Sequence, residues 1–269
     1  IAGPGQNPTI PHPMPNVPEP IIKFLSIDFM VGMAKLSARI SPDVFYKYLR
    51  AYGFGVHTGI DLPGEADGYL KKPNSYSQIS KEFMSFGYEI SMTPLQLITA
   101  LSATINGGIL YKPFITKRIS DNQGNIIKDI SATKIRRVIS KRTSDLVKDM
   151  MVSSIEQGTG KNARMDNVVI GGKTGTAQKF IDGSYSSSLY NSSFVGFLPA
   201  LNPKLICLIK VSEPKIGKYG GQVAAPIFKS IMERILEADL DLVPEEQIIN
   251  RNKMLHANLK LNEAHANLS

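Results

Sequence analysis

The stretch Gly171-Gly172-Lys173-Thr174-Gly175-Thr176-Ala177-Gln178-Lys179 indicates both how the chain folds and what it binds. The apolar run Val168-Val169-Ile170 precedes it, which predicts a buried strand that ends in a lysine and two hydroxyls. Because Gly175 has no Cβ, another backbone can lie close to the strand, and an extended peptide can pair with its edge. Lys173 supplies a positive charge, and the hydroxyls of Thr174 and Thr176 suit a carboxylate. These residues predict a site for an acidic, extended, peptide-like ligand.

The size and composition of the chain favour a globular protein with a sizeable core. Its 269 residues, 42% of them hydrophobic, fit one large domain or two small ones. The net charge of +8 is compatible with nucleic acid, an anionic membrane or an acidic substrate. The basic residues are spread out and form no nucleic-acid motif, so we expect no nucleic-acid partner. No apolar run approaches the ~18 residues that a transmembrane helix needs.

Composition divides the chain into three regions. Residues 1–20 hold seven of the 17 prolines, which predicts a linker or a disordered lead-in. Residues 21–237 carry helix and strand patterns and are predicted to form the domain, and residues 238–269 read as a polar helical tail. The tail histidines, His256 and His265, stand without further ligands, so we expect no metal site. No nucleotide cofactor is implied either, because no phosphate loop is present.

Capping signals and apolar patterns predict an α+β fold. N-caps at Ser41, Thr93 and Ser140 predict three helices. Further helices are expected from Ile21 to Leu36 and from Val223 to Leu236, a short strand within 58–65, and strands over 193–200 and 205–212. Successive strands joined by short turns, with helices before and after, predict an antiparallel sheet covered by helices. The single cysteine, Cys207, lies in the last of these strands and is interpreted as a core thiol.

The chain resembles the transpeptidase domain of class B penicillin-binding proteins, the bacterial enzymes that cross-link the cell wall. Lys-Thr-Gly is a signature of the serine penicillin-recognising enzymes. The match covers about Val31 to Leu236, and its pieces are Tyr52-Gly53-Phe54-Gly55, Thr58-Gly59-Ile60-Asp61-Leu62-Pro63-Gly64-Glu65, Ser85-Phe86-Gly87-Tyr88, Thr93-Pro94-Leu95-Gln96-Leu97, Gly158-Thr159-Gly160-Lys161, the Lys173 stretch, Ser193-Phe194-Val195-Gly196-Phe197, and Gly220-Gly221-Gln222-Val223-Ala224-Ala225-Pro226. Serine β-lactamases and D,D-carboxypeptidases share the Lys-Thr-Gly chemistry, but the second and fourth of these pieces favour the class B family.

The resemblance implies a helical subdomain and a five-stranded antiparallel sheet with the active site between them. In the family, a serine attacks a D-alanyl-D-alanine amide or a β-lactam and forms an acyl-enzyme. Carried over to this sequence, Lys173 tunes the charge of the site, Thr174 and Thr176 bind the substrate carboxylate beside Gly175, and the Thr176 amide donates to the oxyanion. The implied partners are peptidoglycan stem peptides, β-lactams and a membrane glycosyltransferase. The implied location is the periplasmic side of the bacterial cytoplasmic membrane, with the anchor outside this chain.

The nucleophile of that mechanism is not recognisable in the sequence. No Ser-x-x-Lys precedes Val31, and Ser26-Ile27-Asp28 fits the second motif, Ser-x-Asn or Ser-x-Asp, but lies two residues too early. Literal matches at Ser131-Ala132-Thr133-Lys134, Ser212-Glu213-Pro214-Lys215 and Ser120-Asp121-Asn122 come in the wrong chain order and lie in strand-like or turn segments. We assign none of the three a catalytic role. Glu89 is a smaller departure, because the family commonly has glycine there.

Two hypotheses follow from the missing motif. The first is a fragment of a membrane-anchored D,D-transpeptidase whose nucleophile segment is absent from this chain, since the sequence starts at Ile1 rather than at a methionine. The second is a non-catalytic relative that keeps the peptide-binding strand and acts as a scaffold in a cell-wall complex. Under either hypothesis, we expect little or no transpeptidation by the isolated chain.

Overall fold

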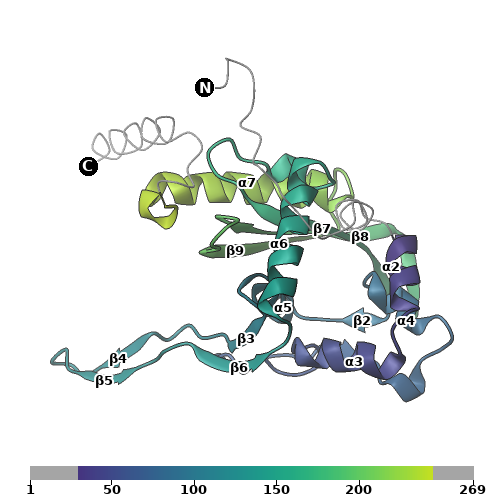
Figure 1. Ribbon diagram of the computed structural model, residues 1–269, viewed down its shortest axis with the longest axis horizontal. Coiled ribbons are helices and arrows are strands. Elements are labelled where there is room, and N and C mark those ends of the chain that lie inside the picture. The colour runs from purple at the N-terminus through teal and green to yellow at the C-terminus, as the bar shows by residue number, and fades with distance from the viewer. Residues whose placement is uncertain (1–29, 245–269) are drawn as a thin grey trace, which may run out of the picture.

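The structure of the protein, a computed structural model, describes residues 30–244 (Figure 1). Its elements along the chain are α2 (Met30–Ser37), α3 (Pro42–Ala51), β1 (Tyr69–Leu70), η1 (Pro73–Ser75), α4 (Ser80–Ser85), β2 (Ile90–Ser91), α5 (Pro94–Ile105), β3 (Ile109–Lys112), β4 (Arg118–Ser120), β5 (Ile126–Asp129), β6 (Thr133–Arg137), α6 (Lys141–Glu156), η2 (Lys161–Ala163), β7 (Gly171–Ile181), β8 (Ser184–Leu198), β9 (Leu205–Ser212), α7 (Gly220–Ala238) and η3 (Leu240–Leu242). Helices and antiparallel strands are mixed in one body, which confirms the predicted α+β class.

The central sheet is antiparallel, in the order β7-β8-β9. A two-residue turn, Asp182-Gly183, joins β7 to β8, and both residues have positive φ, which matches the right-handed twist of a hairpin. The resemblance implies five strands, whereas the sheet has three within residues 30–244. The predicted strand over 168–170 is also displaced, because β7 begins at Gly171. Short ladders elsewhere, such as β1 with β2, do not join this sheet.

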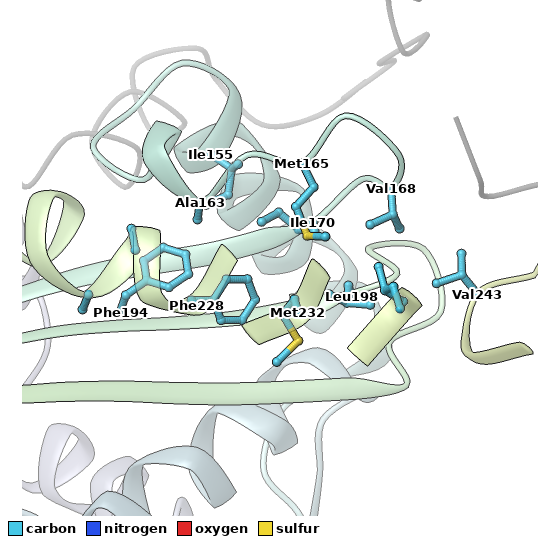
Figure 2. Packing of buried hydrophobic residues seen from close by; sticks show 13 residues of the cluster. Ile155, Ala163, Met165, Val168, Ile170, Phe194, Leu198, Phe228, Met232 and Val243 are labelled. Atoms are coloured by element: carbon cyan, nitrogen blue, oxygen red, sulfur yellow. The ribbon is translucent and has the colours of Figure 1, made fainter. Parts of the chain in front are cut away.

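The core lies between the sheet and its helices. Phe228 of α7 and Phe194 of β8 are fully buried and meet edge to face, with ring centroids 5.0 Å apart. Ile155 of α6 and Leu198 of β8 belong to the same cluster (Figure 2). A second cluster on α5, α6 and β8 includes Val195 and Phe197, so alternate residues of β8 enter two apolar layers. Both faces of the strand next to β7 are therefore packed, which holds β7 in place.

Helix caps appear where the sequence predicts them. Ser41 and Ser140 each accept a hydrogen bond from a backbone N–H in the first turn of their helices. Thr93 and Gln96 form a capping box at the start of α5. The Gln96 amide, almost fully buried, also donates to the carbonyls of Val56 and Asp67 at 2.6 and 2.7 Å. One side chain thus caps α5 and fixes the loop between α3 and β1.

The segment from Thr58 to Glu65 contains no strand, contrary to the prediction. Its carboxylates hold loop backbone instead. Glu65 accepts from the amides of Thr58 and Gly59 at 2.6 and 3.0 Å, and Asp61 accepts from the amides of Ile115 and Thr116 at 2.8 Å each. Backbone donors that a strand would pair with another strand are satisfied here by side chains.

The predicted region boundaries fall mostly outside the described residues. The lead-in over 1–20 lies outside them, as do the first residues of the helix expected from Ile21. At the other end, Val243 is buried in the same cluster as Leu198, so the packed body extends to that residue. The rest of the tail, with its two histidines, is outside the described part. Within 30–244, no helix is long and apolar enough to cross a membrane. Cys207 is half-buried against the core, and burial raises the pKa of its thiol.

Candidate active site

The predicted binding residues lie together on β7, at the edge of the sheet. Within residues 30–244, β7 has one strand partner, β8, so its other edge carries no strand in the described part. Thr174 is buried, and Lys173, Gly175 and Thr176 are partly exposed. An unpaired edge with a cation and two hydroxyls on it can accept an extended ligand by main-chain pairing. The assignment of these four residues to ligand binding stays a prediction.

The two threonine hydroxyls are held by residues from other elements. Thr174 Oγ1 lies 2.7 Å from Thr159 Oγ1, and Thr176 Oγ1 accepts from the Gly220 amide at 3.0 Å. Asn162 donates to the Gly221 carbonyl at 2.8 Å, which ties η2 to the start of α7. Each threonine rotamer is therefore fixed by hydrogen bonds before any ligand binds. A hydroxyl that accepts from Gly220 still has its own proton to donate to an anion.

The Lys173 side chain lies along its own strand. Its ammonium donates to the Thr174 carbonyl at 3.1 Å. The residue is partly exposed, so the charge lies next to the strand backbone at a partly exposed position. This position places a positive charge at the backbone of Thr174, which suits an anionic group bound along the strand.

Gly175 of β7 and Gly220 of α7 lie on the two sides of a close backbone contact. A Cβ on Gly175 would lie 2.5 Å from Ser193 Oγ on β8. A Cβ on Gly220 would lie 2.1 Å from the Ser193 carbonyl oxygen and 2.5 Å from the Gly175 carbonyl oxygen. The missing Cβ of Gly220 therefore lets a second backbone approach β7 and β8, while the pairing of a peptide with the strand at Gly175 stays a prediction. The approaching backbone in the structure is the first turn of α7.

Residues 30–91, here called the helical subdomain, contact β7 and the β7–β8 hairpin through aromatic side chains. Tyr88 donates to Gln178 Oε1 at 3.3 Å, and its ring meets Tyr185 edge to face with centroids 4.6 Å apart. Tyr185 lies on β8, and its hydroxyl accepts from the Glu89 amide at 3.0 Å. These contacts fix the distance between the subdomain and the end of β7 beyond Thr176.

Glu89 anchors that junction, which sequence reasoning noted only as a departure from the family. Its φ of 53° lies in the left-handed region that disfavours side chains. Its carboxylate accepts from Ser80 Oγ at 2.6 Å and from Lys71 Nζ at 3.2 Å. The Ser80 hydrogen bond, followed by the Lys71 contact, holds the pKa of the Glu89 carboxyl below its usual range. Its conformational strain is therefore balanced by charge-assisted bonds to two other elements.

A hollow of about 420 Å³ lies between the first half of β8, the residues that follow β9 and the start of α7. Its lining residues include Tyr190, Lys218 and Tyr219, and the Lys218 ammonium lies 5.3 Å from the centroid of each tyrosine ring. The Ser192 hydroxyl donates to the Lys218 carbonyl at 2.6 Å, which connects this loop to the sheet. Tyr219, which lines the hollow, precedes Gly220, whose amide donates to Thr176 Oγ1. The hollow therefore lies next in sequence to the residue that orients Thr176.

The candidate serines that the structure describes are not brought to β7. Ser26 and Asp28 lie outside the described residues. Ser120 and Ser131 are exposed and belong to the β4–β6 region, which projects away from the sheet (Figure 1). Ser212 ends β9, with β8 between it and β7. No group of three or more His, Cys, Asp or Glu side chains in the part that the structure describes is placed to hold a metal ion.

Comparisons with known proteins agree with one another. The model of the penicillin binding protein transpeptidase domain matches residues 29–233. Stage V sporulation protein D of Bacillus subtilis is 38% identical over 222 residues, which cover 82% of this chain and 34% of that protein. The probable peptidoglycan D,D-transpeptidase PenA of Neisseria meningitidis is 36% identical over 204 residues, covering 75% of this chain and 33% of that protein. The chain thus spans about a third of the length of these curated relatives.

A solved structure gives the same result for the fold. Penicillin binding protein 3 of Mycobacterium tuberculosis, in complex with aztreonam, superposes with a TM-score of 0.76 at 28% sequence identity. The superposition covers 84% of this chain and 53% of that one.

Proposed function

This chain belongs to the penicillin-binding protein transpeptidase family, and from that premise we propose that it forms the peptide-binding half of a peptidoglycan D,D-transpeptidase site. The edge of β7 that has no strand partner within residues 30–244, with its lysine and threonines, carries the proposal. A donor stem peptide ending in D-alanyl-D-alanine lies along this edge as an added strand. Its terminal carboxylate is held by the hydroxyls of Thr174 and Thr176 beside Lys173.

The proposed chemistry is acyl transfer through a serine. The serine oxygen attacks the carbonyl between the two D-alanines, and its proton passes to a neighbouring base. The peptide bond breaks, the terminal D-alanine leaves with a proton, and an acyl-enzyme remains. An amine of a second stem peptide then displaces the serine and forms the cross-link. The Thr176 amide contributes one of the donors to the oxyanion of each tetrahedral intermediate. We assign no residue of this chain as the nucleophile.

β-Lactams are the second proposed ligand class. The strained lactam amide takes the place of the D-alanyl-D-alanine bond. The carboxylate of the drug takes the place of the C-terminal carboxylate of the peptide. The solved relative in complex with aztreonam supports this extension. A membrane glycosyltransferase as partner, and a location on the outer side of the cytoplasmic membrane, complete the proposal for the whole protein.

A non-catalytic peptide-binding module is the alternative function. It is favoured by one observation: the chain's literal Ser-x-x-Lys matches, at Ser131 and Ser212, lie away from β7. Such a module retains the binding edge but forms no acyl-enzyme.

Labelling with a fluorescent penicillin separates the two functions. The chain and the protein expressed from its native gene are incubated with the probe, and the label is mapped by mass spectrometry. Lys173→Ala is tested beside Lys210→Ala, which removes an exposed lysine from β9 of the same sheet. A single labelled serine, lost in Lys173→Ala and kept in Lys210→Ala, supports the transpeptidase.

Two other outcomes count against that assignment. Equal labelling of both variants shows that Lys173 does not serve the site. No label on either folded protein rejects the acyl-enzyme, and binding of ampicillin measured by calorimetry then decides for or against the non-catalytic module.

A further inference from the structure

A projecting arm of the chain, residues 109–137, leaves several apolar side chains exposed to water, although Leu110 at its base is buried. It consists of two short ribbons, β3 with β6 and β4 with β5, and extends from the body (Figure 1). Ile115, Ile126 and Ile127 are 63%, 54% and 67% exposed, and Ile119 and Ile135 are also exposed. A two-stranded ribbon is only marginally stable by itself in water, and clustered exposed apolar residues mark interaction surfaces.

The arm also holds most of the net charge of the chain. It contains seven lysines and arginines against two aspartates, a net charge of +5 out of +8 for all 269 residues. The basic residues of the arm are Lys112, Lys117, Arg118, Lys128, Lys134, Arg136 and Arg137. This concentration matters because the rest of the chain, nearly nine-tenths of its length, accounts for the remaining +3. A surface with this charge attracts an acidic partner.

The base of the arm is fixed to the body. Asp61 accepts from the amides of Ile115 and Thr116, and the Thr116 hydroxyl, followed by these amides, lowers the pKa of Asp61 to about 2. Arg136 donates to the Arg50 carbonyl at 3.3 Å, and Arg137 donates to the Gly107 carbonyl at 2.6 Å. The arm therefore points in a set direction, so its face is presented in a defined position.

The details of the arm favour docking by side chains to a protein. Register shifts interrupt both ribbons, at Leu110/Tyr111 and at Ile119/Ser120, and such bulges discourage the addition of a further strand. The tip carries Asp121, whose carboxylate accepts a hydrogen bond from the Asn125 side chain. An anion at the tip opposes insertion into an anionic membrane. Exposed isoleucines adjoin cations in Lys117-Arg118-Ile119 and in Ile126-Ile127-Lys128, and such a surface matches acidic and aliphatic side chains.

We propose that the arm is a docking element for an acidic, aliphatic surface of a partner protein, distinct from the peptide edge of β7. The isoleucines supply the dry centre of the contact, and the lysines around them select an acidic partner. The proposal is independent of catalysis, because the arm is separate from the Lys173 site in the fold.

Site-specific photo-crosslinking in the native host tests the proposal. Benzophenone-alanine is placed at Ile127, with the same residue placed at Ile216, an exposed isoleucine in the loop before α7, as control. Adducts are digested and the partner segment is sequenced by mass spectrometry. The test is repeated in Lys117→Glu/Lys128→Glu and in the matched charge control Lys204→Glu/Lys210→Glu, two exposed lysines at and near β9. Thermal melts verify that all variants fold.

The expected result is an adduct at Ile127 with a net-acidic protein segment. Its yield falls by about tenfold in the arm variant and is unchanged in the charge control, because only the arm charges face the partner. An adduct with a lipid or a glycan, equal loss in both charge variants, equal adducts at Ile127 and Ile216, or no adduct at all overturns the proposal.

Discussion

Replacing Glu89 with glycine sets two opposing effects against each other at one position. The residue has a φ of 53°, where glycine is relaxed and other residues are strained by about 1 kcal/mol. Its carboxylate, however, accepts hydrogen bonds from Ser80 and Lys71. Glu89→Gly removes the strain and the bonds together, so the sign of the change in stability shows which effect is larger.

The structure indicates that the bonds are larger. The Ser80 hydroxyl is fully buried and lies 2.6 Å from the carboxylate, so losing this charge-assisted bond costs about 2 kcal/mol. The Lys71 pair is about a quarter exposed on each side and adds about 0.5 kcal/mol. The extra backbone freedom of glycine in the unfolded chain costs about 0.7 kcal/mol, close to the strain that is relieved. We therefore expect Glu89→Gly to lower the free energy of unfolding by about 2 kcal/mol.

Urea unfolding and thermal melts of the chain measure this change. A loss of this size lowers the Tm by about 4–8 °C in a domain of this length. Asp182→Gly is the matched control, because Asp182 also has a positive φ, is exposed, and has no side-chain hydrogen bond to the described residues. It should change stability by less than about 0.5 kcal/mol. A Glu89→Gly protein as stable as the wild type, or more stable, would refute the reasoning.

The pH dependence gives an independent check on Glu89. Its pKa in the folded protein lies below its unfolded value, so its contribution is present above the unfolded pKa of about 4.3. The contribution is lost as the pH falls through the folded pKa. The stability difference between the wild type and Glu89→Gln should therefore shrink below about pH 4. A difference that is constant from pH 7 to pH 3 would contradict this.

Three further predictions concern the supports of the site and of the arm. Gln96→Leu removes the buried amide that donates to the carbonyls of Val56 and Asp67 and should cost about 3 kcal/mol in urea unfolding. A cost below about 1 kcal/mol would show that water replaces the amide. Gly220→Ala places a Cβ 2.1 Å from the Ser193 carbonyl oxygen, so α7 must move and the rate of β-lactam binding should fall. An unchanged rate together with unchanged stability would contradict the close packing. Asp61→Asn should speed hydrogen exchange of the Thr116 amide. In the wild type, the same amide should lose protection as the pH falls from about 4 towards 2, because the pKa of Asp61 is lowered and its carboxylate stabilises the contact only above that range. Exchange that follows only the intrinsic pH dependence of an amide would refute this.

Local chemistry made much of the fold predictable from sequence. Ser41, Thr93 and Ser140 cap helices in the structure as predicted, because each cap depends only on residues within one turn. The Asp182-Gly183 turn was missed although Asp-Gly is a strong hairpin signal. Reading it would have extended the strand expected from 193 back to Ser184.

The candidate site was predictable in part, for a physical reason. The residues of the Lys173 stretch carry their chemistry in their own side chains. Their supports do not: Thr159 lies 15 residues from Thr174 and Gly220 lies 44 residues from Thr176, so these bonds exist only once the chain is folded. The positive φ of Glu89 likewise depends on Ser80 and Lys71, which are distant in sequence. The five-strand count of the sheet was implied by the resemblance, and no local pattern in the sequence specifies it.

The contact between Gly175 and Gly220 has a consequence for how the protein can evolve under antibiotic pressure. A side chain at Gly220 pushes the first turn of α7 off the strands, and with it the amide that orients Thr176, whereas a Cβ at Gly175 meets the Ser193 hydroxyl. Variants with weaker drug affinity are therefore expected in the exposed approach to α7, at Lys218 and Tyr219, and not at Gly220. A saturation library across 171–222, selected for survival on a β-lactam, would show this as a gap at Gly220.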